Sequence, residues 1–335
     1  MVVRCSVLKP FVAGVAVVAL AACANANPQI PNESAFAAVL GAVHHDTWST
    51  EKAIPTAVMC SGAAAIGTKI YVVGGIDSSL TIVGDNQIYD TTKNTWSTGK
   101  AMPTARWCPG VAVANGIVYV IGGNTSISGA TDVVEAYDPA MNSWTEKATL
   151  PIANSPVAVT DGKFVYALGG YSGSSGRLPN VYQYDPAKNS WSTSIPLLLG
   201  RSNPGVGTIA GKIIVADGLT NNGVTTETEA YAPKKKSWKT VASDLTARTA
   251  GCSAAIGGNL YLAGGELGGG SAPDTDILDA YDAKKNSWAA KADMPQATVA
   301  PGAATAGGRL YCFGGASSGN PYGATFYDDT QVYQP

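Results

Sequence analysis

Residues 117–144 read IVYVIGGNTSISGATDVVEAYDPAMNSW, and this stretch decides the fold because its main features recur along the chain. It contains an apolar run that ends in a glycine pair, then a Tyr-Asp pair, and then a tryptophan seven residues after the tyrosine. The tryptophans recur roughly every 48 residues, at Trp48, Trp96, Trp144, Trp191, Trp238 and Trp288. The matching tyrosines are Tyr89, Tyr137, Tyr184, Tyr231 and Tyr281, and Tyr333 ends the series without a following tryptophan. The chain therefore contains six units of one repeat.

Each unit is typical of four short antiparallel strands. Within residues 110–144 these are a strand of small residues, a strand ending in the glycine pair, a strand ending in Tyr-Asp and a strand carrying the tryptophan. The glycine pair permits positive φ and close backbone approach, while the aromatic rings fill the space between neighbouring units. Polar residues between the last two strands, such as Asp138 and Asn142, are expected to bond the hairpin backbone. The fourth glycine pair is degenerate and reads Asp217-Gly218.

The repeat resembles the Kelch family over roughly residues 42–335, because the glycine pair, tyrosine and tryptophan recur at locked spacing. The resemblance implies an all-β fold, a six-bladed β-propeller with four antiparallel strands per blade. The first tryptophan unit lacks its three preceding strands, and the last unit has three strands and stops at Pro335. We therefore expect residues 46–53 to join the C-terminal blade and close the ring, which removes exposed sheet edges.

The composition argues against several classes of function. A formal net charge of -2 gives no basic field for nucleic acid, and the lysine run 234–236 is too short to create one. The two histidines, His44 and His45, lie outside the repeats. This argues against a Ser-His-Asp triad, a histidine-ligated metal and copper chemistry of the galactose oxidase type found in the Kelch family. We expect no metal and no cofactor, and binding rather than catalysis as the main function.

The N-terminus predicts export. Residues 1–22 have the basic start and apolar run of a secretory signal peptide, and the run is too short for a membrane span. Leu20-Ala21-Ala22-Cys23 resembles the bacterial lipobox, which implies cleavage before Cys23 and lipidation of its thiol. Ala24 then implies sorting to the outer membrane, facing the periplasm or the surface, if the source is Gram-negative. The alternative is cleavage after Ala26, which would give a soluble periplasmic or secreted protein.

The rest of the chain divides in two. Residues 23–41 are rich in small and polar residues and are expected to form a tether. Residues 42–335 hold the repeats and are expected to form the propeller. Its only expected contact with a membrane is through the lipid anchor.

A column of arginines is the first candidate binding site. The loop from the second to the third strand and the loop that enters the first strand should emerge on one face, around the mouth of the central channel. The positions sixteen residues before each glycine pair are Val58, Arg106, Ala153, Arg201, Arg248 and Thr298. In animal Kelch proteins that recognise acidic peptides, arginines in this column line the ligand-binding mouth. The resemblance implies that role for Arg106, Arg201 and Arg248, and the alternative is that they brace loops by bonding carbonyls.

Further residues are expected on the same face. Trp107 follows Arg106 and is either rim packing or a stacking surface for a sugar or peptide. Glu266 directly follows the fifth glycine pair and would be a natural acid or base partner for an arginine, with a solvated loop carboxylate as the alternative. Asp77, Asn124 and Tyr171 should reach the same place.

The cysteines of the repeats leave a disulfide open. Cys60 and Cys108 occupy equivalent positions in adjacent units, and export would allow them to pair. The alternative is that Cys60, Cys108, Cys252 and Cys312 are buried small hydrophobic residues. A thiolate metal site is disfavoured because they lie on different units without close pairing.

Three functions remain open. The leading hypothesis is a binding module for a protein, an acidic peptide or an acidic glycan, with ligand contacts from Arg106, Trp107, Arg201, Arg248 and Glu266. The alternative comes from resemblance to exported bacterial six-bladed Kelch proteins that are sialic-acid mutarotases. It implies that Glu266, with Arg248 or Arg201, supplies the acid and base groups for sugar epimerisation. The third is a purely structural role in the cell envelope.

Overall fold

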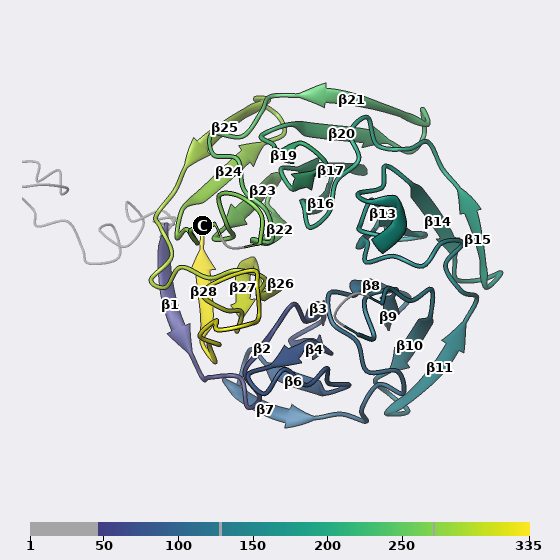
Figure 1. The fold of residues 1–335 in the computed structure, drawn as a ribbon, viewed down its shortest axis with the longest axis vertical. Coiled ribbons are helices and arrows are strands. Elements are labelled where there is room, and N and C mark those ends of the chain that lie inside the picture. Colours follow the sequence, from purple (N-terminus) through teal and green to yellow (C-terminus); the bar gives the residue numbers. More distant parts are fainter. Residues whose placement is uncertain (1–45, 127–128, 271) are drawn as a thin grey trace, which may run out of the picture. The chain divides into compact units, whose positions relative to one another are not determined.

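The propeller is the part of the chain that the computed structural model describes, at residues 46–126, 129–270 and 272–335. In these residues six β-sheets follow one another in sequence order around a central axis (Figure 1). The predicted signal peptide, the tether and Cys23 lie outside the described residues. Within the described ranges the helical structure is a short 3-10 turn, η1 (Gly173–Ser175), and no helix is long and apolar enough to cross a membrane.

Each sheet is a blade of four antiparallel strands, which confirms the predicted fold. Blade 1 contains β3 (Gly62–Ile66), β4 (Lys69–Val73), β6 (Asn86–Asp90) and β7 (Thr95–Thr98). Blade 2 contains β8 (Gly110–Ala114), β9 (Ile117–Ile121), β10 (Val134–Asp138) and β11 (Ser143–Lys147). Blade 3 contains β12 (Val157–Thr160), β13 (Val165–Leu168), β14 (Val181–Asp185) and β15 (Ser190–Thr193). Blade 4 contains β16 (Gly205–Ile209), β17 (Lys212–Ala216), β20 (Thr228–Ala232) and β21 (Ser237–Val241). Blade 5 contains β22 (Cys252–Ile256), β23 (Asn259–Ala263), β24 (Leu278–Asp282) and β25 (Ser287–Ala290). Blade 6 contains β26 (Gly302–Ala306), β27 (Arg309–Phe313), β28 (Thr330–Gln334) and β1 (Thr47–Glu51). Two small sheets, β2 (Val58–Met59) with β5 (Ile76–Asp77) and β18 (Leu219–Thr220) with β19 (Gly223–Val224), belong to the loops of blades 1 and 4.

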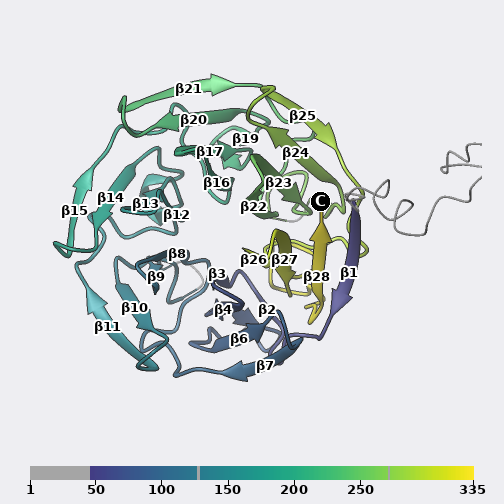
Figure 2. The same ribbon diagram turned by 180° about the vertical axis from the view of Figure 1, so that it is seen from behind.

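The ring closes as the sequence predicted. Strand β1 pairs antiparallel with β28, so that Trp48 lies opposite Tyr333. Both views of the ribbon place β1 as the outermost strand beside β28 (Figures 1 and 2). The Trp48 indole also donates a hydrogen bond of 2.7 Å to the carbonyl oxygen of Ala292 in blade 5. The first and last parts of the propeller therefore share one sheet, which closes the ring.

The repeated aromatic and polar residues join each blade to the one before it. In blade 2, the Tyr137 and Trp144 rings lie with their centroids 5.1 Å apart. The Tyr137 hydroxyl donates to Asn142 Oδ1 at 2.8 Å, and the same oxygen accepts the Lys100 backbone N–H at 2.8 Å. The Trp144 indole donates to the Lys100 carbonyl at 2.8 Å. Equivalent tryptophan bonds are made by Trp48, Trp96, Trp191, Trp238 and Trp288. The repeated tyrosine, asparagine and tryptophan therefore bond each blade to the blade before it.

The glycine pairs fasten the blades near the axis. Gly74 has φ +66, and a Cβ there would lie 2.3 Å from the Arg106 carbonyl oxygen, so only glycine fits without movement. The following Gly75 donates its N–H to that oxygen at 3.0 Å. Blade 4 carries Asp217 at the first position with φ 60, although its Gly218 keeps the equivalent bond to Arg248 at 2.9 Å. Asp217 is therefore a strained substitution at a position built for glycine.

Candidate functional site

A belt of backbone hydrogen bonds runs around the axis where the chain enters the first strands of blades 1, 2, 4, 5 and 6. Its donors and acceptors are Cys60, Cys108, Asn203, Ala250 and Ala300, all with positive φ. Cys108 donates to Cys60 and Cys60 to Ala300 at 2.6 Å each, while Ala300 donates to Ala250 at 2.7 Å and Ala250 to Asn203 at 3.0 Å. We call these five residues the belt.

The belt is interrupted at blade 3. That blade reads Ser155-Pro156-Val157 where blade 2 reads Trp107-Cys108-Pro109-Gly110, so it is one residue shorter. The N–H groups of Trp107 and Ser155 donate to equivalent carbonyls, those of Asn124 and Tyr171. Blade 3 has one residue fewer between the column position and its glycine pair. Counting back sixteen residues from Gly169 therefore gave Ala153 as the column residue. The structure instead places Asn154 there, since Gly123 donates to its carbonyl at 3.0 Å.

A pocket of about 350 Å³ lies against the belt on the face that carries the loops between the second and third strands. We call it the mouth pocket. Its wall includes four residues that directly follow glycine pairs or their equivalent, namely Asn124, Tyr171, Leu219 and Glu266. Trp107, Arg177, Ser155 and Ser202 also line it, together with the belt residues. The size and the few converging polar groups are typical of a small-ligand site.

Glu266 is a buried carboxylate in this wall, only 4% exposed. The Gly270 N–H donates to its Oε1 at 3.0 Å, and a Cβ on Gly319 would lie 2.8 Å from both of its oxygens. Loops of blades 5 and 6 therefore close against this carboxylate. Its burial raises the pKa of Glu266, and the amides of Gly270 and Gly319 oppose that rise. Its Oε2 has no hydrogen bond of normal geometry from the described residues.

Arg177 is the cation of the mouth pocket, and the sequence analysis missed it. Its guanidinium carbon lies 5.7 Å from the centroid of the Tyr171 ring, which is 42% exposed. Its Nε is buried and has no hydrogen-bond partner in the described parts of the chain. Arg177 lies in the loop between the second and third strands of blade 3, in bridge contact with Tyr171. A search of these loops for charged residues would have found it, whereas a fixed count back from the glycine pair could not.

Trp107 packs at the rim of the mouth pocket, one of the two roles that the sequence left open. Its backbone is paired with Asn124, and its indole N–H donates to the Ser126 carbonyl at 3.2 Å. The ring packs on a buried apolar cluster that includes Met59 and Ile76. Trp107 also lines the mouth pocket, so one part of this residue faces the pocket while its ring packs on the cluster. Asp77 instead caps its own loop, because its Oδ1 accepts the N–H groups of residues 79 and 81 at 2.9 Å.

The arginine column points away from the mouth pocket. The side chains of Arg106 and Arg201 are fully buried. Arg106 lies 3.0 Å from a Glu135 oxygen and donates to a backbone carbonyl of its own blade, and Arg201 pairs with Glu229. Burial lowers the pKa of Arg106 to about 10, and Glu135 partly offsets this. These contacts are those of loop braces, the alternative that the sequence left open.

Arg248 is the centre of a denser cluster. It is 1% exposed, and its guanidinium contacts three carboxylates. These are Asp279, Asp244 at 3.4 Å and Asp217 at 3.6 Å. Neither Arg201 nor Arg248 lines the mouth pocket, so the structure does not bring them together with Glu266 there. The ligand and catalytic roles expected for the column therefore have no exposed guanidinium to act through.

Blades 1 and 6 use glutamine in the same brace position. Gln87 accepts the Thr56 N–H at 2.8 Å and donates to the Thr56 carbonyl at 3.2 Å. Gln331 makes the same two bonds with Gln296, at 3.0 and 3.1 Å. A polar side chain on the third strand thus holds the incoming loop in each case, and this recurrence supports a structural role for the arginine and acid pairs.

Two disulfides link adjacent blades. Cys60 and Cys108 are bonded with a Cα–Cα distance of 4.6 Å, so the pairing that the sequence left open is present. Cys252 of blade 5 is bonded to Cys312 of blade 6 with a Cα–Cα distance of 5.8 Å. The sequence did not predict this second bond, because Cys252 lies on a first strand and Cys312 on a second strand, and their spacing gives no equivalence.

Comparisons with known proteins agree with this architecture. A family model described as the KLHDC2/KLHL20/DRC7 Kelch-repeats domain matches residues 39–203, which contain blades 1 to 3. Among solved structures, the chain is similar to one titled "Structure of YjhT", with a TM-score of 0.72 and 16% sequence identity over 84% of this chain and 95% of that chain. At this identity the likeness concerns the fold alone. No curated protein matches the chain. The blade geometry shows an all-β, six-bladed propeller, and the match shows Kelch repeats in residues 39–203.

Proposed function

We propose that this propeller is an exported binding protein that takes an acidic glycan or an acidic peptide into the mouth pocket. One observation carries the proposal. Glu266 and Arg177 line the same pocket, and Oε2 of Glu266 and Nε of Arg177 are buried without a hydrogen bond of normal geometry from the described residues. Buried polar groups without partners are costly, and a ligand that bonds both would remove that cost.

The chemistry of the wall favours an acidic sugar over a peptide side chain. The planar guanidinium of Arg177 suits a carboxylate, and the exposed face of Tyr171 suits the apolar face of a sugar ring. The free oxygen of Glu266 accepts a hydrogen bond from a hydroxyl group. A uronic or sialic acid presents a carboxylate and hydroxyls together, whereas an acidic side chain would satisfy Arg177 alone.

A second function, sugar epimerisation, is favoured by the raised pKa of Glu266. A carboxyl group whose pKa is moved toward neutrality by burial is suited to give and take a proton. The partner cation would then be Arg177, in place of the Arg248 or Arg201 expected from the sequence. Anomer exchange opens the sugar ring, which removes a proton from the anomeric hydroxyl and adds one to the ring oxygen. Glu266 would take and return the proton, while Arg177, which keeps its own proton, would hold the sugar carboxylate.

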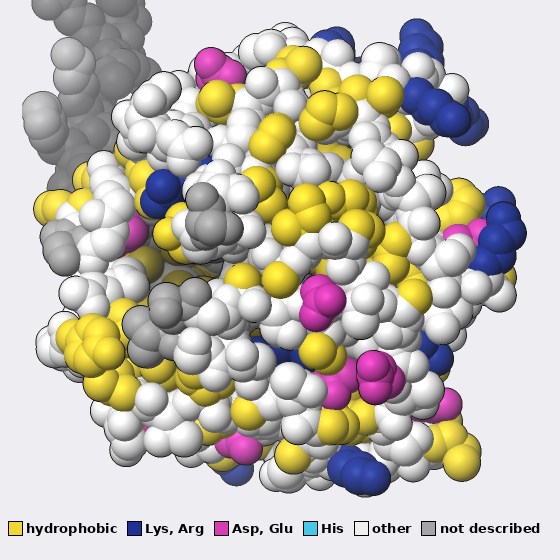
Figure 3. All heavy atoms as spheres, turned by 45° about the vertical axis from the view of Figure 1, so that its right-hand side comes forward, with side chains coloured by type: hydrophobic (Ala, Val, Ile, Leu, Met, Phe, Trp, Pro, Cys, Tyr) yellow, Lys and Arg dark blue, Asp and Glu magenta, His cyan; other side chains and the backbone are white. Residues whose placement is uncertain are grey.

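Export and the lipid anchor at Cys23 are part of the proposal. Two disulfides support an oxidising compartment, since such bonds persist in exported proteins and are rare in the cytosol. If the source is Gram-negative, the expected place is the outer membrane, with the propeller facing the periplasm or the surface, and the alternative is a soluble periplasmic or secreted protein. We expect no nucleic-acid partner, and on the face seen in Figure 3 the lysine and arginine side chains lie at separate places.

Thermal shifts of the full-length protein against sialic acids, uronic acids, neutral sugars and acidic peptides would test the proposal. We expect a saturable shift with the sugar acids that Arg177→Gln abolishes. Lys163→Gln is the matched control, because Lys163 also covers an aromatic ring, Phe164 at 4.8 Å, in a turn between first and second strands. No shift across the whole panel would refute small-ligand binding. NMR of anomer exchange then separates the two functions, since Glu266→Gln should stop exchange and still bind if the protein is an epimerase.

A further inference from the structure

The Cys60–Cys108 disulfide lies where a small molecule can reach it. Both cysteines are only half-buried, and both line the mouth pocket. Both also line a second cavity of about 200 Å³ that continues along the axis among the first strands. The bond therefore separates two solvent-sized spaces instead of being enclosed in side chains.

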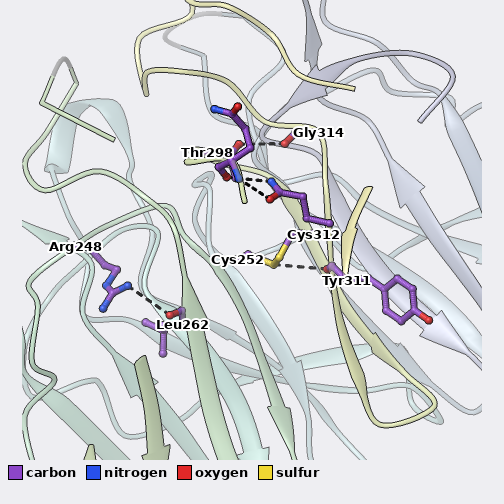
Figure 4. The surroundings of a disulfide bond; sticks show 9 residues. Arg248, Cys252, Leu262, Thr298, Tyr311, Cys312 and Gly314 are labelled. Atoms are coloured by element: carbon purple, nitrogen blue, oxygen red, sulfur yellow. Dashed lines mark hydrogen bonds between the residues drawn. A yellow bond between two sulfur atoms is a disulfide. The ribbon is translucent and has the colours of Figure 1, made fainter. Parts of the chain in front are cut away.

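The second disulfide provides an internal contrast. Cys252 and Cys312 are 0% and 1% exposed and belong to an apolar cluster with Tyr261 and Leu310. Figure 4 shows this bond deep among the strands of blades 5 and 6, with Cys252 Sγ 3.6 Å from the Tyr311 carbonyl oxygen. A thiolate can attack a disulfide only if it reaches a sulfur along the bond, so access decides the rate. The two bonds should differ strongly in reactivity.

We propose that Cys60–Cys108 is a site of thiol–disulfide exchange for small thiols that enter the mouth pocket, and that Cys252–Cys312 is structural. The thiolate of the small molecule attacks Sγ of one cysteine and forms a mixed disulfide, and the other cysteine leaves as a thiolate. A second thiol then breaks the mixed disulfide. The products are two cysteine thiols and one small-molecule disulfide, so two electrons pass from the small thiols to the protein.

The belt explains why the fold would survive this exchange. The Cys108 N–H donates to the Cys60 carbonyl at 2.6 Å, and Cys60 donates onward to Ala300. These backbone bonds hold blades 6, 1 and 2 together whether or not the sulfurs are joined. Two other belt positions are already alanine, Ala250 and Ala300, with the same positive φ as the cysteines. Exchange would therefore change the wall of the pocket and leave the ring closed.

The test treats the folded full-length protein with reduced glutathione or dithiothreitol, and then labels new thiols with iodoacetamide. Mass spectrometry of the peptides distinguishes each cysteine of the blades from Cys5 and Cys23. We expect Cys60 and Cys108 to be labelled at least tenfold faster than Cys252 and Cys312, with unchanged circular dichroism. Equal rates, faster labelling of the buried pair, or labelling only in denaturant would overturn the proposal.

A variant checks that the fast thiols come from the pocket. Cys60→Ala with Cys108→Ala places at both positions the residue that two other blades carry in the belt. Under the same reducing conditions this variant should lose the fast phase of labelling completely. If the fast phase persists at Cys252 and Cys312, the difference in access is not the cause and the proposal fails.

Discussion

Asp217→Asn should stabilise the propeller, and the gain should grow as the pH rises. Asp217 is 1% exposed beside Asp244, and burial first, then the charge of Asp244, raises the pKa of Asp217 to about 10. Arg248 opposes the rise but is shared with Asp244 and Asp279. At neutral pH the pair Asp217 and Asp244 therefore holds one proton in the folded state. An asparagine amide can donate to Asp244 as the protonated carboxyl does, without binding a proton.

The magnitude follows from proton linkage. Between the usual aspartate pKa near 4 and the raised value in the fold, the folded protein binds a proton that the unfolded chain has released. Each pH unit in this window lowers the free energy of unfolding by about 1.4 kcal/mol. The advantage of Asp217→Asn should thus widen from about 1 kcal/mol at pH 5 toward at most about 4 kcal/mol at pH 7. Asp217→Gly should add about 1 kcal/mol by relieving the positive φ, less the cost of the space it leaves.

Urea unfolding followed by tryptophan fluorescence at pH 5, 6, 7 and 8 measures this difference. The control is Asp279→Asn, which removes the nearest partner of Arg248 and should destabilise by about 3 kcal/mol. The reasoning is refuted if the difference between Asp217→Asn and the parent protein does not change with pH, or if the variant is the less stable protein at pH 8.

Three further changes test the fold. Arg201→Val should cost about 3 to 5 kcal/mol by leaving Glu229 buried without its cation, and adding Glu229→Gln should recover most of this in denaturant melts. Deleting residues 46–52 should remove the outer strand of blade 6 and abolish a cooperative unfolding transition, whereas an intact transition would show that β1 is dispensable. Cys252→Ala with Cys312→Ala should lower the free energy of unfolding by at most about 4 kcal/mol, because the disulfide joins residues 60 apart in the sequence. An unchanged midpoint of urea unfolding would show that this disulfide does not stabilise the fold.

The fold could be predicted from the sequence because each repeated residue has a fixed partner in the neighbouring blade. Tyr137, Asn142 and Trp144 all contact the chain around Lys100, so their spacing cannot drift without breaking several bonds. The closing strand could be predicted for the same reason. The Trp48 indole donates to the chain of blade 5 in the same way as the tryptophan of every other fourth strand donates to the preceding blade. The spacing of the repeats was therefore enough to predict the architecture, including which loops lie on the face of the mouth pocket.

The direction of the arginine side chains could not be obtained from spacing, yet the sequence contains a signal for it. The column residue gives its carbonyl to the glycine pair of the preceding blade, and in blades 2, 4 and 5 its arginine side chain turns toward the third strand of its own blade. The two positions should therefore vary together, as buried partners must. The three column arginines each have an acid on the third strand, as Arg106 with Glu135, Arg201 with Glu229 and Arg248 with Asp279. Where the column residue is Val58 or Thr298, the third strand carries Gln87 or Gln331, which bonds the incoming backbone instead. An arginine with an acid on the third strand of its own blade is already paired, although Nε and Nη1 of Arg106 have no hydrogen-bond partner in the described residues. Glu266 could be found from its fixed place directly after the fifth glycine pair, whereas Arg177 lies in a loop whose length varies between blades, so that no fixed count along the chain reaches it.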